Sequence, residues 1–197
     1  MKLDLVHDVQ SAYRKLLNSM ARPGNIENLD GEAKKVDMNT YTYRGTFLIM
    51  LMLLDGEVSF NVVSKNEMYI TSLVSQITYA KLKPIEEADY IFVINDSVDK
   101  ELDEIFKRAK IGNLVDPNKS ATIIAEFDYI EEGNNLELIG PGIKGINRIS
   151  LSGNSEWIGS RKGKNEEYPL GIDAIYLDKN ENVLCLPRTT QVKEKEE

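Results

Sequence analysis

Three short clusters of proline and glycine beside apolar residues constrain the last third of this chain more than any other feature. They lie at residues 140–143 (GPGI), 168–173 (YPLGID) and 184–190 (LCLPRTT). Proline fixes one backbone torsion and glycine adopts torsions that other residues resist, so each cluster requires a defined bend at the end of a strand. Together the clusters indicate a fixed local geometry around a shared surface.

Hydrophobic periodicity divides the rest of the chain into helices and strands. Apolar residues recur at helical spacing over residues 9–20, and Pro23-Gly24 ends this helix. Residues 68–79 carry strand-forming Thr, Ile and Val, but the helical spacing of their apolar residues favours a helix. Further helices are predicted from Asn39 or Thr40 to Leu54 and over residues 102–112, and strands at 58–62, 90–94, 121–127, 136–139, 172–177 and 183–186.

Strands mixed with amphipathic helices predict an α/β fold in which a mixed central sheet is flanked by helices. The sheet is mixed because the last two strands form a hairpin around the polar turn at residues 178–182. The strand at 136–139 is expected to continue this sheet. Residues 152–167, rich in Gly, Ser, Lys and Asn around Trp157, are expected to form a surface segment with one aromatic anchor.

Charge and length exclude several classes of protein. We predict a single domain at residues 1–191 and a charged, solvated tail at 192–197. A net charge of -8 and a pI near 4.9 argue against nonspecific binding to nucleic acid or to anionic membranes, since both need clustered Lys and Arg. The amino terminus lacks the pattern of a secretory signal, and the longest apolar run, residues 47–54, is too short to span a bilayer.

The first cluster contains a spacing that dinucleotide-binding loops also use. Gly140, Gly142 and Gly145 satisfy G-x-G-x-x-G after an apolar strand, but residues 146–150 show no amphipathic helix to bind a phosphate. The other interpretation is a tight bend, whose backbone amides could face a neighbouring subunit or an anion. The missing helix favours the bend.

Asp173 and Arg188 are the candidate binding pair. If the hairpin loop spans residues 179–182, the register places them opposite each other on one sheet face. One interpretation is a structural ion pair, because the planar guanidinium suits a carboxylate. The other is that Arg188, with Thr189 and Thr190, holds an oxygen of a phosphate or phosphonate. On that face the pair would lie with Ile175, Leu177, Leu184 and Leu186.

No catalytic set emerges from the remaining reactive residues. His7 is the one histidine and precedes the first helix without a recognisable nucleophile beside it in the sequence. Cys185, the one cysteine, alternates with apolar neighbours and is expected to be buried. So few Cys and His residues exclude most metal sites built on nitrogen and sulfur, exclude an internal disulfide, and fit a reducing cytoplasmic setting.

Five motifs spread along the chain resemble one known family. Read together, they look like the PhnH family of the bacterial carbon-phosphorus lyase system. The order and spacing of the last two carry most of the resemblance, which spans nearly the whole chain. The motifs are residues 20–24 (MARPG), 59–62 (SFNV), 138–143 (LIGPGI), 168–173 (YPLGID) and 186–190 (LPRTT).

This resemblance implies a fold like the large domain of pyridoxal-phosphate-dependent transferases, without the cofactor site. It also implies a homodimer when isolated, and a core complex with PhnG, PhnI and PhnJ. The implied function is that of an accessory subunit in organic phosphonate catabolism. With PhnG, PhnI and PhnL, such a subunit is required to form ribose 1-methylphosphonate 5-triphosphate from ATP and methylphosphonate, in a synthase of the transferase class.

Several expectations for the site follow. We expect no catalytic residue, metal or cofactor in this chain, and a phosphonate or nucleotide as the possible ligand. The candidates for ligand or partner binding are Arg188, Thr189, Thr190, Asp173, Gly140 and Gly142. The alternative function is a stand-alone enzyme that depends on a dinucleotide or on pyridoxal phosphate.

Overall fold

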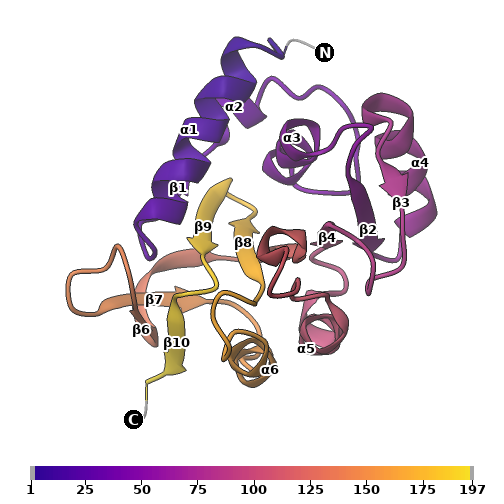
Figure 1. The fold of residues 1–197 in the computed structure, drawn as a ribbon. Helices are drawn as coiled ribbons and strands as arrows, with labels where there is room; N and C mark the ends of the chain where they lie inside the picture. Colours follow the sequence, from indigo (N-terminus) through magenta and orange to yellow (C-terminus); the bar gives the residue numbers. More distant parts are fainter. Residues whose placement is uncertain (1–2, 196–197) are drawn as a thin grey trace.

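Residues 3–195, described by a computed structural model, form a seven-stranded and a three-stranded sheet (Figure 1). In the larger sheet, the first five strands of the order given below run parallel; the sixth pairs antiparallel with the fifth, and the seventh pairs antiparallel with the sixth. The α/β fold with a mixed central sheet is therefore confirmed. The order is β3 (Lys81–Leu82), β2 (Ser59–Val63), β4 (Tyr90–Val93), β5 (Thr122–Phe127), β8 (Asp173–Asp178), β9 (Asn182–Leu186) and β1 (Glu27–Asn28).

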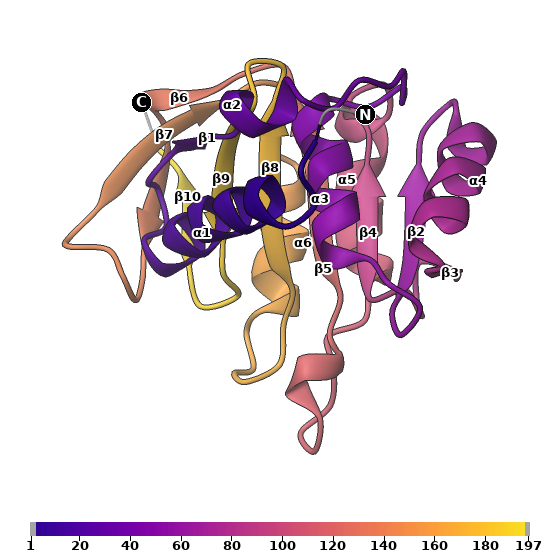
Figure 2. The same cartoon turned by 90° about the horizontal axis from the view of Figure 1, so that it is seen from above.

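Helices cover both faces of this sheet (Figures 1 and 2). One face packs against α1 (His7–Ala21), α3 (Arg44–Leu53) and α4 (Glu67–Thr78), and α2 (Asp30–Ala33) lies beside them. The other face packs against α5 (Val98–Arg108), α6 (Trp157–Lys164) and the smaller sheet, and a short 3-10 helix, η1 (Pro117–Lys119), precedes β5. Two apolar cores result, one on each face, because the central strands are buried on both sides.

The smaller sheet corrects one prediction. Residues 136–139 do not continue the main sheet but belong to β6 (Ile130–Ile139), which pairs antiparallel with β7 (Asn147–Leu151) and β10 (Gln191–Glu194). The physical reason is local, since β6 follows β5 after only two residues and turns back into a hairpin with β7. Leu136 and Leu138 then complete the core beneath α6.

Three more expectations change in detail. The segment at 152–167 contains a helix, α6, and its Trp157 is buried against Phe106 and Tyr176. The segment expected as a tail at 192–197 begins inside β10, where Val192 is buried while the charged side chains that follow it up to residue 195 are exposed. Residues 196–197 lie outside the described residues. The helix expected from Asn39 or Thr40 begins at Arg44.

The hairpin of β8 and β9 is confirmed, but its register differs by one residue from the prediction. Ile175 pairs with Cys185, and Leu177 pairs with Val183. Leu184 and Leu186 therefore face the opposite core from Ile175 and Leu177. The cause is a loop of three residues instead of four, in which Glu181 adopts a positive φ of 64°.

Among residues 3–195, none of the helices is long and apolar enough to cross a membrane.

Candidate functional site around Arg188 and Asp173

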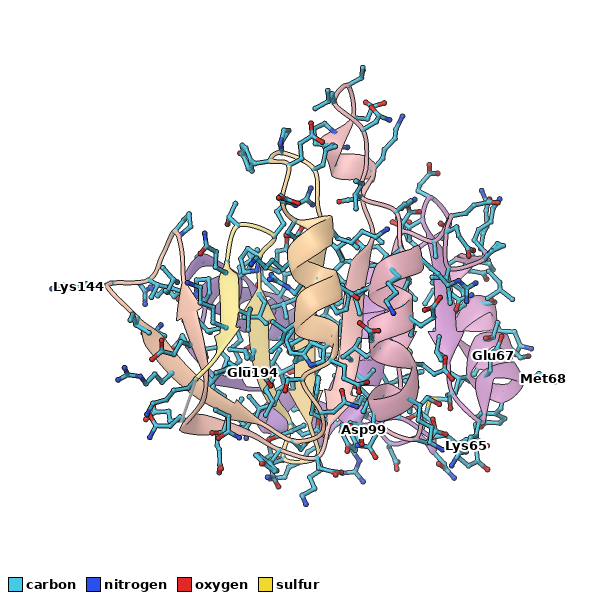
Figure 3. The ribbon with its side chains drawn as sticks, turned by 90° about the horizontal axis from the view of Figure 1, so that it is seen from below. Lys65, Glu67, Met68, Asp99, Lys144 and Glu194 are labelled. Carbon is cyan, nitrogen blue, oxygen red and sulfur yellow. The ribbon has the colours of Figure 1, made fainter. Side chains whose placement is uncertain are left out.

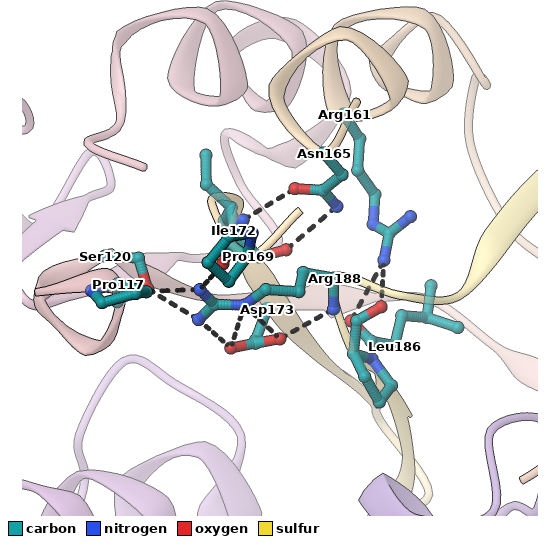
Figure 4. Close-up of polar contacts among 10 residues, drawn as sticks. Pro117, Ser120, Arg161, Asn165, Pro169, Ile172, Asp173, Leu186 and Arg188 are labelled. Atoms are coloured by element: carbon teal, nitrogen blue, oxygen red, sulfur yellow. Dashed lines mark hydrogen bonds and ion pairs between the residues drawn. The ribbon is translucent and has the colours of Figure 1, made fainter. Parts of the chain in front are cut away.

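Arg188 and Asp173 meet at the amino-terminal end of β8 (Figure 4). The backbone N–H of Arg188 donates to Asp173 Oδ1 over 2.7 Å, and Nη2 donates to Oδ2 over 2.6 Å. Both side chains are largely buried. The predicted pair therefore forms, although the register slips, because Arg188 lies beyond Leu186, the last residue of β9.

The remaining donors of Arg188 bind two loops. Nη2 donates to Ser120 Oγ over 2.7 Å, and Nη1 donates to the carbonyl oxygens of Pro117 and Pro169, each over 3.1 Å (Figure 4). Nε lies 3.3 Å from both oxygens of Asp173. A guanidinium has five N–H groups, and here all five point to partners within the described chain. This geometry favours the structural ion pair over a direct grip on a ligand anion.

A second arginine, Arg161 on α6, fixes the chain that follows β9. Its Nη1 donates to the carbonyl oxygen of Thr190 over 2.8 Å, and its Nη2 donates to those of Pro187 (2.7 Å) and Leu186 (3.2 Å). Arg161 is buried, which lowers the pKa of its guanidinium. The two arginines therefore hold residues 186–190 from both sides.

Thr189 and Thr190 differ in exposure. Thr189 is exposed, whereas Thr190 is 2% exposed and its N–H donates to Pro187 O over 2.9 Å. Its hydroxyl has no hydrogen-bond partner among residues 3–195 and does not reach the surface. Of the two threonines, Thr189 is therefore the one whose side chain reaches the surface.

The glycine cluster forms the predicted bend. After β6 the chain turns at Gly140 and Gly142 and continues into β7 instead of a helix, so the setting of a dinucleotide-binding loop is absent from this described segment. Gly142 has a φ of 81°, and a Cβ there would lie 2.3 Å from the carbonyl oxygen of Ala21. At Gly140 a Cβ would lie 2.9 Å from Thr189 O. The bend thus packs against two other motifs of the sequence.

The opposite, carboxyl-terminal edge of the sheet holds one buried glutamate, Glu126, and one half-buried glutamate, Glu181. Glu126 on β5 accepts hydrogen bonds from Tyr43 N (2.7 Å) and Asn95 N (3.1 Å), and Glu181 accepts one from Gly45 N (2.7 Å). Burial raises the pKa of Glu126 to about 7 and also raises that of Glu181. Open α/β sheets bind ligands at this edge, often at a helix amino terminus. Here the chain's own carboxylates occupy the amino terminus of α3.

The remaining reactive side chains, His7 and Cys185, lie in contrasting surroundings. His7 is the first residue of α1 and contacts Asp4 on the surface, with 2.9 Å between Nδ1 and Oδ2. Cys185 is buried, and burial raises the pKa of its thiol to about 12, so the nucleophilic thiolate does not form at neutral pH. Within residues 3–195, no group of three His, Cys, Asp or Glu residues is placed to hold a metal ion.

Comparison with known proteins adds the deciding observation. Residues 3–193 match the family model described as bacterial phosphonate metabolism protein (PhnH). The chain belongs to the PhnH family. It is 24% identical over 188 residues to a Stutzerimonas stutzeri protein described as a candidate C-P lyase subunit, HtxG, with 93% of this chain and 85% of that protein covered. It is 28% identical over 203 residues to the alpha-D-ribose 1-methylphosphonate 5-triphosphate synthase subunit PhnH of Rhizobium meliloti (strain 1021), with 96% and 92% covered.

The sequence carries little signal for two buried charged groups of this PhnH-family chain, Arg161 and Glu126. Arg161 lies in a polar segment that predicts exposure, and the only hint is its spacing of four from Trp157, which puts both on one helix face. Glu126 had a clearer signal, since it is the one charged residue in the apolar run 121–127. A carboxylate inside a strand buried on both faces needs hydrogen-bond donors, and two backbone amides supply them.

Proposed function

We propose that this chain is an accessory, non-catalytic subunit of the bacterial carbon-phosphorus lyase system for organic phosphonate catabolism. In this role it acts with other subunits to form ribose 1-methylphosphonate 5-triphosphate from ATP and methylphosphonate. The observation that carries the proposal is the family match over residues 3–193, together with two relatives that are both described as subunits.

The chemistry of the chain supports a role without catalysis. The donors of Arg188 are engaged by the protein itself, the Cys185 thiol is buried, and the amino terminus of α3 is capped by glutamates. Each of these features belongs to a rigid scaffold. The stand-alone enzyme that depends on a dinucleotide or pyridoxal phosphate is not favoured, because the glycine cluster leads into a strand.

Exposed apolar side chains on and beside α4 support assembly with other subunits. Met68, 87% exposed, lies at the outer edge of the molecule in Figure 3, and Tyr69, Ile77 and Tyr79 are also exposed. Beside them is the edge strand β3 with exposed Leu82. The cores of protein interfaces are depleted in charge and enriched in Tyr and Met, and an open strand edge favours pairing with another chain. We therefore assign this face to a subunit of the complex.

The finer parts of the proposal rest on the family resemblance. They are a homodimer of the isolated chain, a cytoplasmic location, assembly with PhnG, PhnI and PhnJ, and likeness to the large domain of pyridoxal-phosphate-dependent transferases without the cofactor site. In this proposal, Thr189 meets the partner or a phosphonate nucleotide. The contact surface around it is shaped by Asp173, Arg188, Gly140, Gly142 and Thr190. The chain itself works without a bound cofactor.

Co-expression tests the function. The tagged chain should co-purify with PhnG, PhnI and PhnJ of the same genome, and omitting it should abolish synthase activity on ATP and methylphosphonate. If those subunits assemble and react fully without it, the proposal is lost. Turnover of the two substrates by this chain alone would replace it with an enzymatic function.

A further inference from the structure

An arm at residues 110–121 projects from the amino-terminal edge of the main sheet, at the bottom of Figure 2 and the top of Figure 3. At its base, Ala121 N donates to Lys110 O over 2.9 Å, and Ile111 forms an antiparallel bridge with Ser120. The arm is therefore a closed loop with paired ends, and it extends away from the core.

The tip of the arm displays two apolar side chains in a defined turn. Leu114 is 69% exposed and Val115 is 88% exposed. Asn113 Oδ1 accepts hydrogen bonds from Val115 N (2.9 Å) and Asp116 N (2.8 Å), which fixes the turn. Exposing both side chains to water is unfavourable, so an ordered apolar tip of this kind indicates a binding contact.

Arg188 and its surroundings brace the arm against the body of the protein. Its guanidinium binds Pro117 O and Ser120 Oγ inside the arm and Pro169 O in the neighbouring loop. Gly171 N donates to Ile111 O over 3.1 Å from the same loop. A contact that is ordered in advance loses less conformational entropy on binding, which suits a protein interface.

An apolar groove opens at the same edge of the sheet. Its volume is about 280 Å³, and it lies where α1 and α3 approach the first residues of β4, β5 and β8. The one charged residue in its lining is Asp173, which Arg188 neutralises. Its apolar lining includes Tyr13, Leu17, Met20, Leu53, Tyr90 and Pro187.

We propose that two copies of this chain exchange arms, so that Leu114 and Val115 of each copy occupy the groove of the other. A two-fold interface needs a surface that complements itself, and one edge of this chain carries both the projecting tip and the groove. The charges also match. Residues 113–115 are uncharged, the groove carboxylate is paired, and Asp116 and Lys119 of the arm pair over 2.7 Å, so neither surface buries an unpaired charge.

A membrane is the less favourable occupant for the tip. The chain carries a net charge of -8, and the two lysines of the arm are paired with Asp89 and Asp116. An apolar tip that inserts into anionic lipid usually relies on free basic residues beside it.

The proposed exchange of arms rests on the homodimer named under the proposed function, and it specifies which surfaces form that homodimer.

Two variants and their mixture test the exchange. The arm variant combines Leu114→Asp with Val115→Asp, and the groove variant is Leu17→Asp. Sedimentation or light scattering should find the unmodified chain dimeric, and each variant should dimerise at least about tenfold more weakly, because a charge enters an apolar contact. Met68→Asp on α4 is the control: Met68 is as exposed as Val115 (87% and 88%) and lies on the face assigned to other subunits, so this variant should leave the dimer intact.

Mixing the two variants is the decisive step. In a mixed pair, the intact arm of one variant meets the intact groove of the other, so heterodimers should form more tightly than either variant alone. A monomeric unmodified chain, an unchanged dimer in either variant, or no gain on mixing would overturn the exchange. Arm-dependent binding to phosphatidylserine vesicles by a monomeric chain would also overturn it. Co-purification with PhnG, PhnI and PhnJ by the monomeric variants would leave the proposed function standing.

Discussion

Arg188 binds both oxygens of Asp173, one through its backbone N–H over 2.7 Å and the other through Nη2 over 2.6 Å. The same guanidinium holds Pro117 and Pro169, so one ion pair joins the strand β8 to two loops that are 52 residues apart in the sequence. All three proline and glycine clusters of this chain therefore contribute to one scaffold, since residues 140–142 also pack on Thr189 and Ala21.

Removing the Arg188 side chain should destabilise the fold. Arg188→Ala leaves the largely buried Asp173 carboxylate without its cation, so we expect the free energy of unfolding to fall by about 2–4 kcal/mol in urea titrations. Arg188→Lys should recover only part of this loss, because an ammonium lacks the planar fork. Normal stability of Arg188→Ala combined with lost phosphonate utilisation would instead make Arg188 a ligand-binding group.

Replacing Gly142 with alanine should destabilise the fold for two reasons. The new Cβ would clash with the carbonyl oxygen of Ala21, and the positive φ is unfavourable for alanine. Gly142 and Gly145 have nearly equal φ values of 81° and 83°, but only Gly142 would place a Cβ against Ala21 O. We expect Gly145→Ala to cost about 1 kcal/mol for the left-handed conformation and Gly142→Ala to cost at least about 1 kcal/mol more. Equal thermal stability of the two variants would show that the bend is free to move away from α1.

The exposed face of α4 should matter for assembly but not for folding. Met68→Glu and Leu82→Glu each replace an exposed apolar side chain, so the free energy of unfolding should change by less than about 0.5 kcal/mol. Co-purification with PhnG, PhnI and PhnJ should fall at least about tenfold, because a buried unpaired carboxylate is costly at an interface. Glu131→Gln on β6 is a surface control that should retain full assembly.

Local patterns predicted most of the elements, and the errors have identifiable physical causes. Alternating and periodic apolar residues located α1, α4, α5 and the five longer strands of the main sheet, but not its two-residue strands β1 and β3. Register and sheet membership depend on contacts between distant residues. The register of β8 and β9 changed because Glu181 accepts a positive φ, and β6 left the main sheet because it pairs with β7.

The candidate site was predictable where the sequence pairs opposite charges, as at Asp173 and Arg188. It was not predictable where a charge is satisfied by the backbone. Arg161 donates to backbone carbonyl oxygens, and Glu126 accepts from backbone N–H groups. Because nearly every residue carries these groups, no pattern of side chains in the sequence predicts such partners. Buried charges of this kind become visible only when the fold places a loop or a helix end beside them.

Glu126 should make stability depend on pH near neutrality. Its pKa of about 7 in the folded chain lies above the ordinary value of 4.5, so the folded state holds its proton more tightly than the unfolded state. This contribution is complete below about pH 4.5 and is lost as the pH rises through 7. The raised pKa of Glu181 acts in the same direction. Unfolding free energies measured from pH 5 to 8 should therefore decline, by roughly 3 kcal/mol.

Glu126→Gln separates this effect from other titrations. The amide cannot ionise, so the decline between pH 5 and 8 should shrink, although the variant loses one acceptor for a backbone N–H and starts from lower stability. Glu131→Gln, on the exposed part of β6, should keep the decline of the unmodified chain. If Glu126→Gln declined as steeply as the unmodified chain, the carboxylate would have to be ionised at pH 5, and its two amide hydrogen bonds would then outweigh the cost of burying its charge.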